Sequence, residues 1–215
     1  AAAQSYYRKA ADTFVKLLDQ SAKDPNYLSA AAQNGIRIRL ARCESGLGEH
    51  SKALEQIEAI LATNPNTLEA QVAAAETYER WGATDPAQYL RAINGRPPTP
   101  QNKVDIWGWN KLALRLQKYP KYADLYRQAR YQVADCSYKL AMAKSGKEKT
   151  DGLAKAATLI ETMARIDPSL GGDEWRPKYD QLLKTIQRAA GRKPDGLGKP
   201  PPSAAQTTAA GASGR

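Results

Sequence analysis

The segment from Leu40 to Ala87 decides the fold: LARCESGLGEHSKALEQIEAILATNPNTLEAQVAAAETYERWGATDPA. Within it, residues of similar kind recur 34 positions apart, because Leu40, Ala41, Gly48 and Ala53 are followed by Ala74, Ala75, Gly82 and Ala87. This period is typical of a helix-turn-helix repeat, in which each unit buries its apolar face only by stacking on its neighbours. The period therefore predicts a scaffold more strongly than it predicts an enzyme.

The residue types within the repeat support a helical reading. Small residues such as Ala41 and Ala74 let two helix backbones approach closely, while larger aliphatic side chains fill the space between helix pairs. Gly48 and Gly82 follow the first helix of each copy, where we expect a left-handed backbone. No stretch shows sustained alternation of apolar and polar residues, so we expect no sheet.

Extending this pattern along the chain predicts an all-α solenoid over residues 1–190. Its helices, about nine in number, are expected near residues 4–22, 26–46, 50–63, 67–82, 85–93, 103–118, 121–145, 150–166 and 173–190. Residues 94–102 (NGRPPTPQN) form an irregular loop between the regular repeats and a more divergent half. From Gly191 to Arg215 the chain is rich in Pro, Ala and Gly, which predicts a disordered or extended tail.

The repeat resembles the tetratricopeptide (TPR) family over roughly residues 10–166. The first copy carries Leu40-Ala41-x-Cys43, Gly48, Ala53-Leu54-x-x-Ile57-x-x-Ile60-Leu61 and Asn64-Pro65. The second copy carries Ala70-x-x-Ala73-Ala74-x-x-x-Tyr78, Gly82 and Ala87. A divergent third copy aligns residues 122–136 with residues 27–43. The resemblance implies a right-handed superhelix. Because the helix over 4–22 reads as the second helix of a repeat, we expect the C-terminal portion of a longer bacterial repeat protein.

TPR proteins bind partner segments on the concave face formed by their first helices. The resemblance places these candidates on that face: Arg37, Arg42, Glu69, Gln71, Glu76, Arg80, Arg127 and Arg130. The variant of the family that grips a C-terminal carboxylate uses a set of Lys and Asn residues. Here Ile38 with Arg42, and Val72 with Glu76, stand at the corresponding positions. The associated chaperone-docking function is therefore not expected.

Charge is distributed unevenly along the chain. The whole sequence carries a formal net charge of +10, to which residues 1–90 contribute −2, residues 91–199 contribute +11 and Arg215 contributes +1. A basic half attracts acidic partners, which include an acidic protein, a nucleic acid, an anionic surface polymer or an anionic membrane. A solvated surface that keeps the protein soluble is the simpler interpretation.

Aromatic and cationic residues alternate most densely between positions 107 and 138. The candidates for partner binding in this stretch are Trp107, Trp109, Lys111, Arg115, Lys118, Tyr122, Tyr126, Arg127 and Arg130. Such a mixture suits single-stranded nucleic acid, whose bases stack on aromatic rings while cations follow the phosphates. It also suits protein interfaces, which are rich in Trp, Tyr and Arg. The simplest alternative is that these rings pack between long helices.

No constellation of residues predicts catalysis or a bound cofactor. The single histidine, His50, opens a predicted helix without a second potential metal ligand nearby, and we expect it to be exposed to solvent. Cys43 and Cys136 occupy equivalent places in two repeats and are expected to be buried free thiols. There is no Gly-rich phosphate loop and no recognisable nucleophile motif. No metal and no cofactor are predicted.

The sequence therefore predicts a non-catalytic scaffold that binds protein partners, within a larger complex or a homo-assembly. One alternative is a basic module that binds a polyanion through residues 107–138, although nucleic acid is the less favoured partner because no regular base-reading code is present. A second alternative is a structural subunit that assembles with itself through its N-terminal helix. No run of apolar residues is long enough to span a membrane. The compartment, cytoplasm or cell envelope, stays open.

Overall fold

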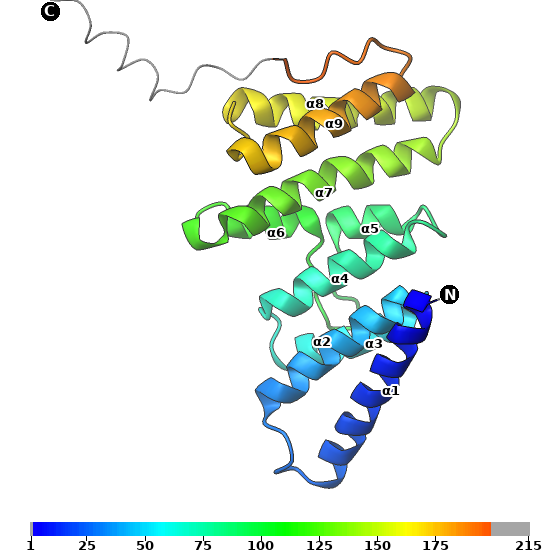
Figure 1. Ribbon diagram of the computed structural model, residues 1–215, viewed down its shortest axis with the longest axis vertical. Helices are drawn as coiled ribbons and strands as arrows, with labels where there is room; N and C mark the ends of the chain where they lie inside the picture. Colours follow the sequence, from blue (N-terminus) through cyan, green and yellow to red (C-terminus); the bar gives the residue numbers. More distant parts are fainter. Residues whose placement is uncertain (1, 199–215) are drawn as a thin grey trace, which may run out of the picture.

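The computed structural model describes residues 2–198, and within them the protein is all helical (Figure 1). The elements are the helices α1 (Ala2–Lys23), α2 (Ala30–Gly46), α3 (His50–Thr63), α4 (Leu68–Trp81), α5 (Gln88–Asn94), α6 (Trp109–Leu116), α7 (Ala123–Met142), α8 (Gly146–Ile166) and α9 (Gly172–Ala189), with a 3₁₀ turn over Pro120–Tyr122. The prediction of an all-α fold is confirmed for this part of the chain.

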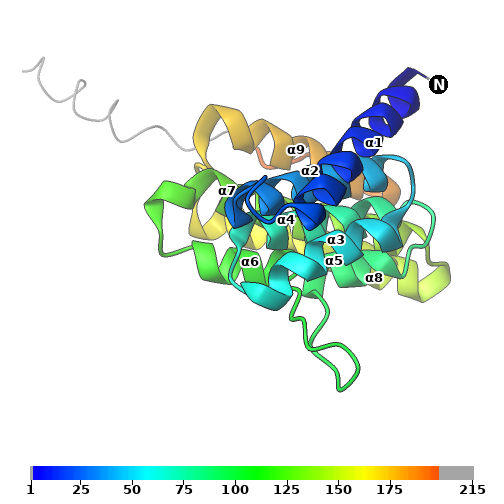
Figure 2. The ribbon, with the colours of Figure 1, turned by 90° about the horizontal axis from the view of Figure 1, so that it is seen from below.

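The helices follow one another along the long axis of the molecule, and each packs mainly on helices close to it in sequence (Figure 1). Helix α1 lies at one end against α2, and α9 lies at the other end against α7 and α8. Viewed along the long axis, α5, α6 and α8 occupy one side, whereas α7 and α9 lie toward the other (Figure 2).

Two large apolar clusters meet at α7. The first runs from α2 to α7 and includes the fully buried side chains of Tyr78 and Trp109, and the second joins α7 to α8 and α9. On α7, Val133 and Cys136 belong to the first cluster, whereas Ala134 and Ala141 belong to the second. Because these residues lie on different faces of one helix, α7 is the element that ties the two halves together.

Most helix bounds agree with the sequence to within a few residues. The predicted helix 50–63 matches α3, and 67–82 matches α4 to within one residue at each end. The start of α2 differs, because Ser29 caps it: the Ser29 hydroxyl accepts a hydrogen bond from the amide of Ala32 at 3.2 Å. Residues 26–29 precede the helix for this reason.

The prediction of a helix over 103–118 is wrong for its first six residues. Residues 103–108 continue the irregular loop, so the loop between α5 and α6 covers 95–108 rather than 94–102 and projects from the side of these helices (Figure 2). Arg96 and Ile106 exchange backbone hydrogen bonds of 2.9 and 3.0 Å across its base. A side chain at Gly95 would overlap the Ile106 carbonyl oxygen, so this pairing requires glycine.

Gln71 anchors the loop and is buried, so its predicted place on an exposed binding face is wrong. Its side chain is fully buried, its amide nitrogen donates to the carbonyl oxygens of Pro65 and Asp105, each at 2.9 Å, and its amide oxygen accepts from the amide of Trp107 at 2.8 Å. All of these partners are backbone groups that would otherwise lose their hydrogen bonds. A polar residue therefore occupies the interior because the loop requires it there.

The two repeat glycines differ in their backbone. Gly48 has φ = 84°, which confirms the left-handed position, whereas Gly82 has φ = −54° and the left-handed prediction is wrong there. A Cβ at Gly82 would overlap the ring of Tyr89 on α5. Close packing of α5 on the end of α4, rather than backbone conformation, therefore accounts for glycine at this position.

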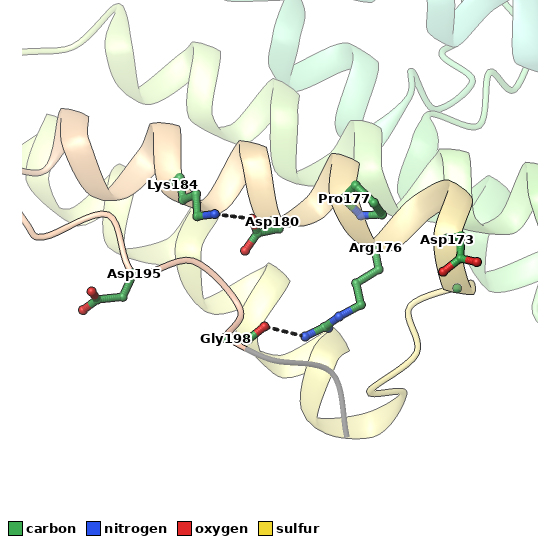
Figure 3. A pocket seen from close by; sticks show the side chains of 8 residues that line it. Asp173, Arg176, Pro177, Asp180, Lys184, Asp195 and Gly198 are labelled. Carbon is green, nitrogen blue, oxygen red and sulfur yellow. Dashed lines mark hydrogen bonds and ion pairs between the residues drawn. The ribbon is translucent and has the colours of Figure 1, made fainter. Parts of the chain in front are cut away.

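Residues 191–198, the first part of the predicted disordered or extended tail, are held against the fold, because they turn back and pack along α9 (Figure 3). The Leu197 amide donates to Asp180 Oδ1 at 2.8 Å, and Arg176 donates to the Gly198 carbonyl oxygen at 3.0 Å. The Gly196 amide donates to Gln187 Oε1 at 2.9 Å, and the Leu197 side chain packs on the second apolar cluster. We call residues 191–198 the C-terminal strap. The remainder of the predicted tail lies outside the described residues.

Candidate functional site

A groove follows α7 on the side occupied by α5, α6 and α8. It consists of two adjoining hollows of about 600 and 370 Å³ that share the side chains of Ile93, Ser137 and Lys155. The further lining residues are Leu90 from α5, Asn110 from α6, Arg130, Val133, Leu140 and Ala141 from α7, Lys144 from the turn after α7, and Glu148, Gly152, Ala154, Thr158, Leu159 and Thr162 from α8. We call this feature the α7 groove.

The chain path explains why the groove exists. Helix α5 has only seven residues and ends where Gly95 begins the loop, and the next helix, α6, begins at Trp109. Both α5 and α6 pack on α7, which packs in turn on α8. Along the long axis α7 lies between α5 and α6 on one side and α8 on the other, so α7 forms the floor and the other three helices form the walls (Figures 1 and 2).

The groove is apolar at its base and keeps apolar residues at its edge. Ile93 and Val133 are buried, and Leu140 and Leu159 are half-buried. Leu90 at the rim is 53% exposed, and Leu114, which is 64% exposed, lies one helical turn beyond Asn110 on α6. Exposed leucines beside an open apolar hollow are typical of a protein-binding surface.

Positive charge predominates at the rim. The lining contains three cations, Arg130, Lys144 and Lys155, and one carboxylate, Glu148. Lys144 pairs with Glu148 at 3.6 Å, whereas Arg130 and Lys155 have no ion pair within residues 2–198. Arg130 Nε donates to the Met163 sulfur at 3.2 Å, which fixes its side chain against α8. The groove therefore presents uncompensated positive charge around an apolar floor.

The two tryptophans predicted as partner contacts are interior residues. Trp109 is fully buried and Trp107 is 5% exposed, so neither indole offers a free face for stacking. The Arg115 guanidinium lies 4.1 Å from the centre of the Trp107 ring, which it covers. Lys111 pairs with Asp105 at 2.5 Å and lies 6.0 Å from the same ring centre. Asp105, Trp107, Lys111 and Arg115 together attach the loop to α6.

The other predicted residues of the aromatic and cationic stretch are divided between two places. Lys118 is exposed near the end of α6, and Tyr122 is half-buried and packs edge-on against Tyr119. Tyr126, Arg127 and Arg130 line a small hollow of about 80 Å³ next to Tyr179 and Met163. Of the fifteen residues predicted from the sequence, Arg130 alone lines the α7 groove.

The candidates on α2 and α4 mainly bond to each other or to their neighbours. Arg42 pairs with Glu69 at 3.5 Å and with Glu76 at 3.6 Å, across α2 and α4. Arg37 donates to Gln56 Oε1 of α3 at 2.8 Å, and Arg80 is exposed near the end of α4. These residues lie on helices that do not line the α7 groove, so the predicted candidates do not form one surface.

Sequence reasoning missed most of the groove. One signal was available: Leu90 and Leu114 stand outside the buried stripes of their short helices, which consist of Gln88, Tyr89, Ala92 and Ile93 on α5 and of Trp109, Leu112, Ala113 and Leu116 on α6. An apolar residue outside the stripe is a candidate for contact with something other than the core. The periodicity of the sequence does not indicate that α5, α6 and α8 lie around one groove.

The buried titratable groups belong to packing rather than to the groove. Burial raises the pKa of the Cys136 thiol, and Glu79 and Asp135 raise it further. Lys139 pairs with Glu79 at 3.2 Å and with Asp135 at 2.6 Å, which links α4 to α7. Both cysteines are buried free thiols, as predicted.

His50 is buried, and its predicted exposure is wrong. Its ring stacks on Trp81 with centroids 5.7 Å apart, and its Nδ1 lies 3.4 Å from Ser45 Oγ. Burial, assisted by the charge of Arg80, lowers the pKa of His50 and favours the neutral ring. Its place at the first residue of α3 therefore reflects packing between α2, α3 and α4.

The α7 groove is consequently the feature of residues 2–198 that best fits a binding site. It can offer apolar contact, hydroxyl and amide groups and positive charge to a ligand. No helix in this part of the chain is long and apolar enough to cross a membrane. No protein-family model, curated protein or solved structure matches the chain.

Proposed function

We propose that the protein is a non-catalytic interaction scaffold that binds a segment of a partner protein in the α7 groove. In this proposal the helices form a TPR-like solenoid with a right-handed superhelix. The 34-residue period supports the TPR-like assignment, since α2 with α3 and α4 with α5 correspond to its two copies. Packing between helices close in sequence is also what a repeat architecture requires.

The observation that carries the function is the apolar floor of the groove between uncompensated cations. Contact with solvent alone does not account for a hollow of about 600 Å³ beside exposed leucines, whereas a binding site does. The polyanion alternative is less well supported, because single-stranded nucleic acid needs several exposed rings for its bases, whereas both indoles are interior and Tyr119 is the one exposed ring between residues 107 and 138. Self-assembly by binding of α1 in the groove of a second copy is not favoured, because α1 and the rim of the groove are both basic.

A selection of peptides on the whole protein tests this proposal. A library of random peptides of about 16 residues, enough for about four helical turns, is selected against the full chain. Binding of the selected peptides is then measured on Thr158→Trp, which fills the groove, and on Thr150→Trp. Both threonines are exposed on α8 and donate to the carbonyl oxygen four residues earlier, but only Thr158 lines the groove.

The two variants give opposite expectations. Because Thr158→Trp occupies the hollow, it should weaken binding at least about tenfold, which corresponds to about 1.4 kcal/mol. Thr150→Trp should leave the dissociation constant within about twofold, since solvent surrounds that position. Circular dichroism checks that both variants fold. Equal binding by both variants would place the partner elsewhere and overturn the proposal.

A further inference from the structure

We infer that the occupant of the α7 groove is an acidic amphipathic α-helix of about four turns, lying along α7. This inference rests on the proposed function and adds the chemistry of the partner. Three observations carry it: the helical walls of the groove, which have no strand edge, the length of the groove, and the sign of its charge.

The walls and the floor of the groove are the sides of helices. Most of its lining residues lie in the interiors of α5, α7 and α8, whose backbone amides and carbonyls are paired inside each helix, whereas Asn110 and Glu148 lie in the first turns of α6 and α8. The groove therefore offers no strand edge to which an extended peptide could add. A ligand must bind through side chains, and a helix satisfies its own backbone while presenting an apolar stripe.

The dimensions suit one short helix. The groove runs from Arg130 on α7 to Lys144 just beyond the end of α7. At about 1.5 Å per residue this distance is about 21 Å, or about four turns. The apolar positions along it, Val133 and Leu140 on the floor with Leu90 and Leu159 at the sides, can receive residues spaced at i, i+3, i+4 and i+7 of a bound helix.

The charge of the groove selects the sign of the partner. Lys155 is exposed at the middle of the groove and belongs to both hollows, with Arg130 toward one end and Lys144 toward the other. Carboxylates flanking the apolar stripe of a bound helix would meet these cations, whereas lysines would meet like charge. The chain's own α1 carries four basic and two acidic residues, so a second copy of this protein is a poor match.

The test compares designed helical probes on the full chain. The first probe is an amphipathic peptide of about 16 residues with leucines on one face and glutamates flanking them, and the second carries lysines in place of the glutamates. A third probe keeps the composition of the first but places a proline at its centre, which breaks the helix. Fluorescence anisotropy measures each dissociation constant for the unaltered chain, for Thr158→Trp, and for two charge reversals on α8.

The charge reversals form a matched pair. Lys155→Glu changes the groove and Lys147→Glu changes an exposed lysine of the same helix that does not line it. We expect Lys155→Glu to weaken the acidic probe about fivefold or more and Lys147→Glu to change it less than about twofold, because surface charges act locally. The lysine and proline probes should bind at least about tenfold more weakly than the acidic probe.

The outcomes separate the inference from the function on which it rests. If library peptides require the open groove but the lysine or proline probe binds as well as the acidic one, the inference fails and the proposed function stands. If the acidic probe binds equally to Thr158→Trp, it occupies another surface and the inference fails. If single-stranded nucleic acid competes with the acidic probe for the groove and binds more tightly, the occupant is a polyanion and the inference is overturned.

Discussion

At the level of single residues, Glu44 is a group whose ionisation opposes folding near neutral pH. Its side chain near the end of α2 is 7% exposed, and one carboxyl oxygen has no hydrogen-bond partner. Burial, with the charges of Glu49 and Glu55, raises its pKa to about 7 although Lys52 acts in the opposite direction. The unfolded chain releases this proton at the ordinary, lower pKa, so stability is lost as pH rises from that value through about 7.

We therefore predict that Glu44→Gln stabilises the protein at pH 8 and loses this advantage toward pH 5. The expected gain is about 1–2 kcal/mol at pH 8, less than the full shift implies because water reaches part of the carboxyl group. Urea unfolding at the two pH values measures the difference, with the exposed Glu174→Gln on α9 as control. A gain of equal size at both pH values would show that new hydrogen bonds of the Gln amide, rather than the ionisation of Glu44, set the effect.

Single residues also mark the limit of what the sequence could predict. Periodicity identifies Tyr78 and Ile57 as interior, because they fall on the apolar stripes of their helices. It cannot identify Gln71 or His50 as interior, since their reasons for burial are a loop and a tryptophan distant in sequence. Polar residues are assigned to the surface by their type, and long-range partners overrule that assignment.

At the level of elements, the C-terminal strap is held by side chains of α9. Asp180 accepts from the Leu197 amide with Oδ1 and pairs with Lys184 through Oδ2 at 2.6 Å (Figure 3). We predict that Asp180→Ala raises the exchange rate of the Leu197 amide about tenfold, the loss of one hydrogen bond to a charged group, while the amides in the middle of α9 keep their protection. Hydrogen exchange measured by NMR reports both.

The control for the strap is Asp173→Ala: Asp173 lines, together with Asp180 and Gly198, a hollow of about 520 Å³ between α9 and the strap, but it makes no hydrogen bond to the strap. It should leave the Leu197 amide unchanged. Gln187 still accepts from the Gly196 amide in both variants, so the strap should loosen rather than detach. If Leu197 exchanges at the same rate with and without Asp180, the apolar contact of its side chain holds the strap and the hydrogen bond does not.

Elements were predicted best where local signals and packing agree. Helices α3 and α4 have strong apolar stripes, and their bounds follow from the sequence. The groove was not predicted, because it results from the shortness of α5 and from the loop 95–108, whose path depends on Gln71 and on the pair Arg96 and Ile106. Composition alone also assigned residues 191–198 to a disordered or extended tail, although Leu197 supplies one apolar anchor and α9 supplies the acceptors.

For the whole molecule, the two apolar clusters that meet at α7 imply that stability is not shared evenly. The second cluster depends on Tyr179, which is 1% exposed, packs on Tyr131 and Trp175, and donates from its hydroxyl to the Arg127 carbonyl oxygen at 2.8 Å. Because each helix packs mainly on close neighbours in sequence, loss of this anchor should act on α8 and α9 without reaching α3 and α4.

We predict that Tyr179→Ala destabilises α8 and α9 by about 3–5 kcal/mol, the usual cost of removing a large buried aromatic side chain, while α3 and α4 stay protected. Hydrogen exchange followed by mass spectrometry compares the helices one by one, with the exposed Arg188→Ala as control.

The α7 groove has one wall on each side of α7, so Tyr179→Ala should also lose peptide binding before it loses the fold of α2 to α5. Equal loss of protection from α2 to α9 would mean that α7 couples the two clusters into a single cooperative unit, and the groove would then be as stable as the molecule itself.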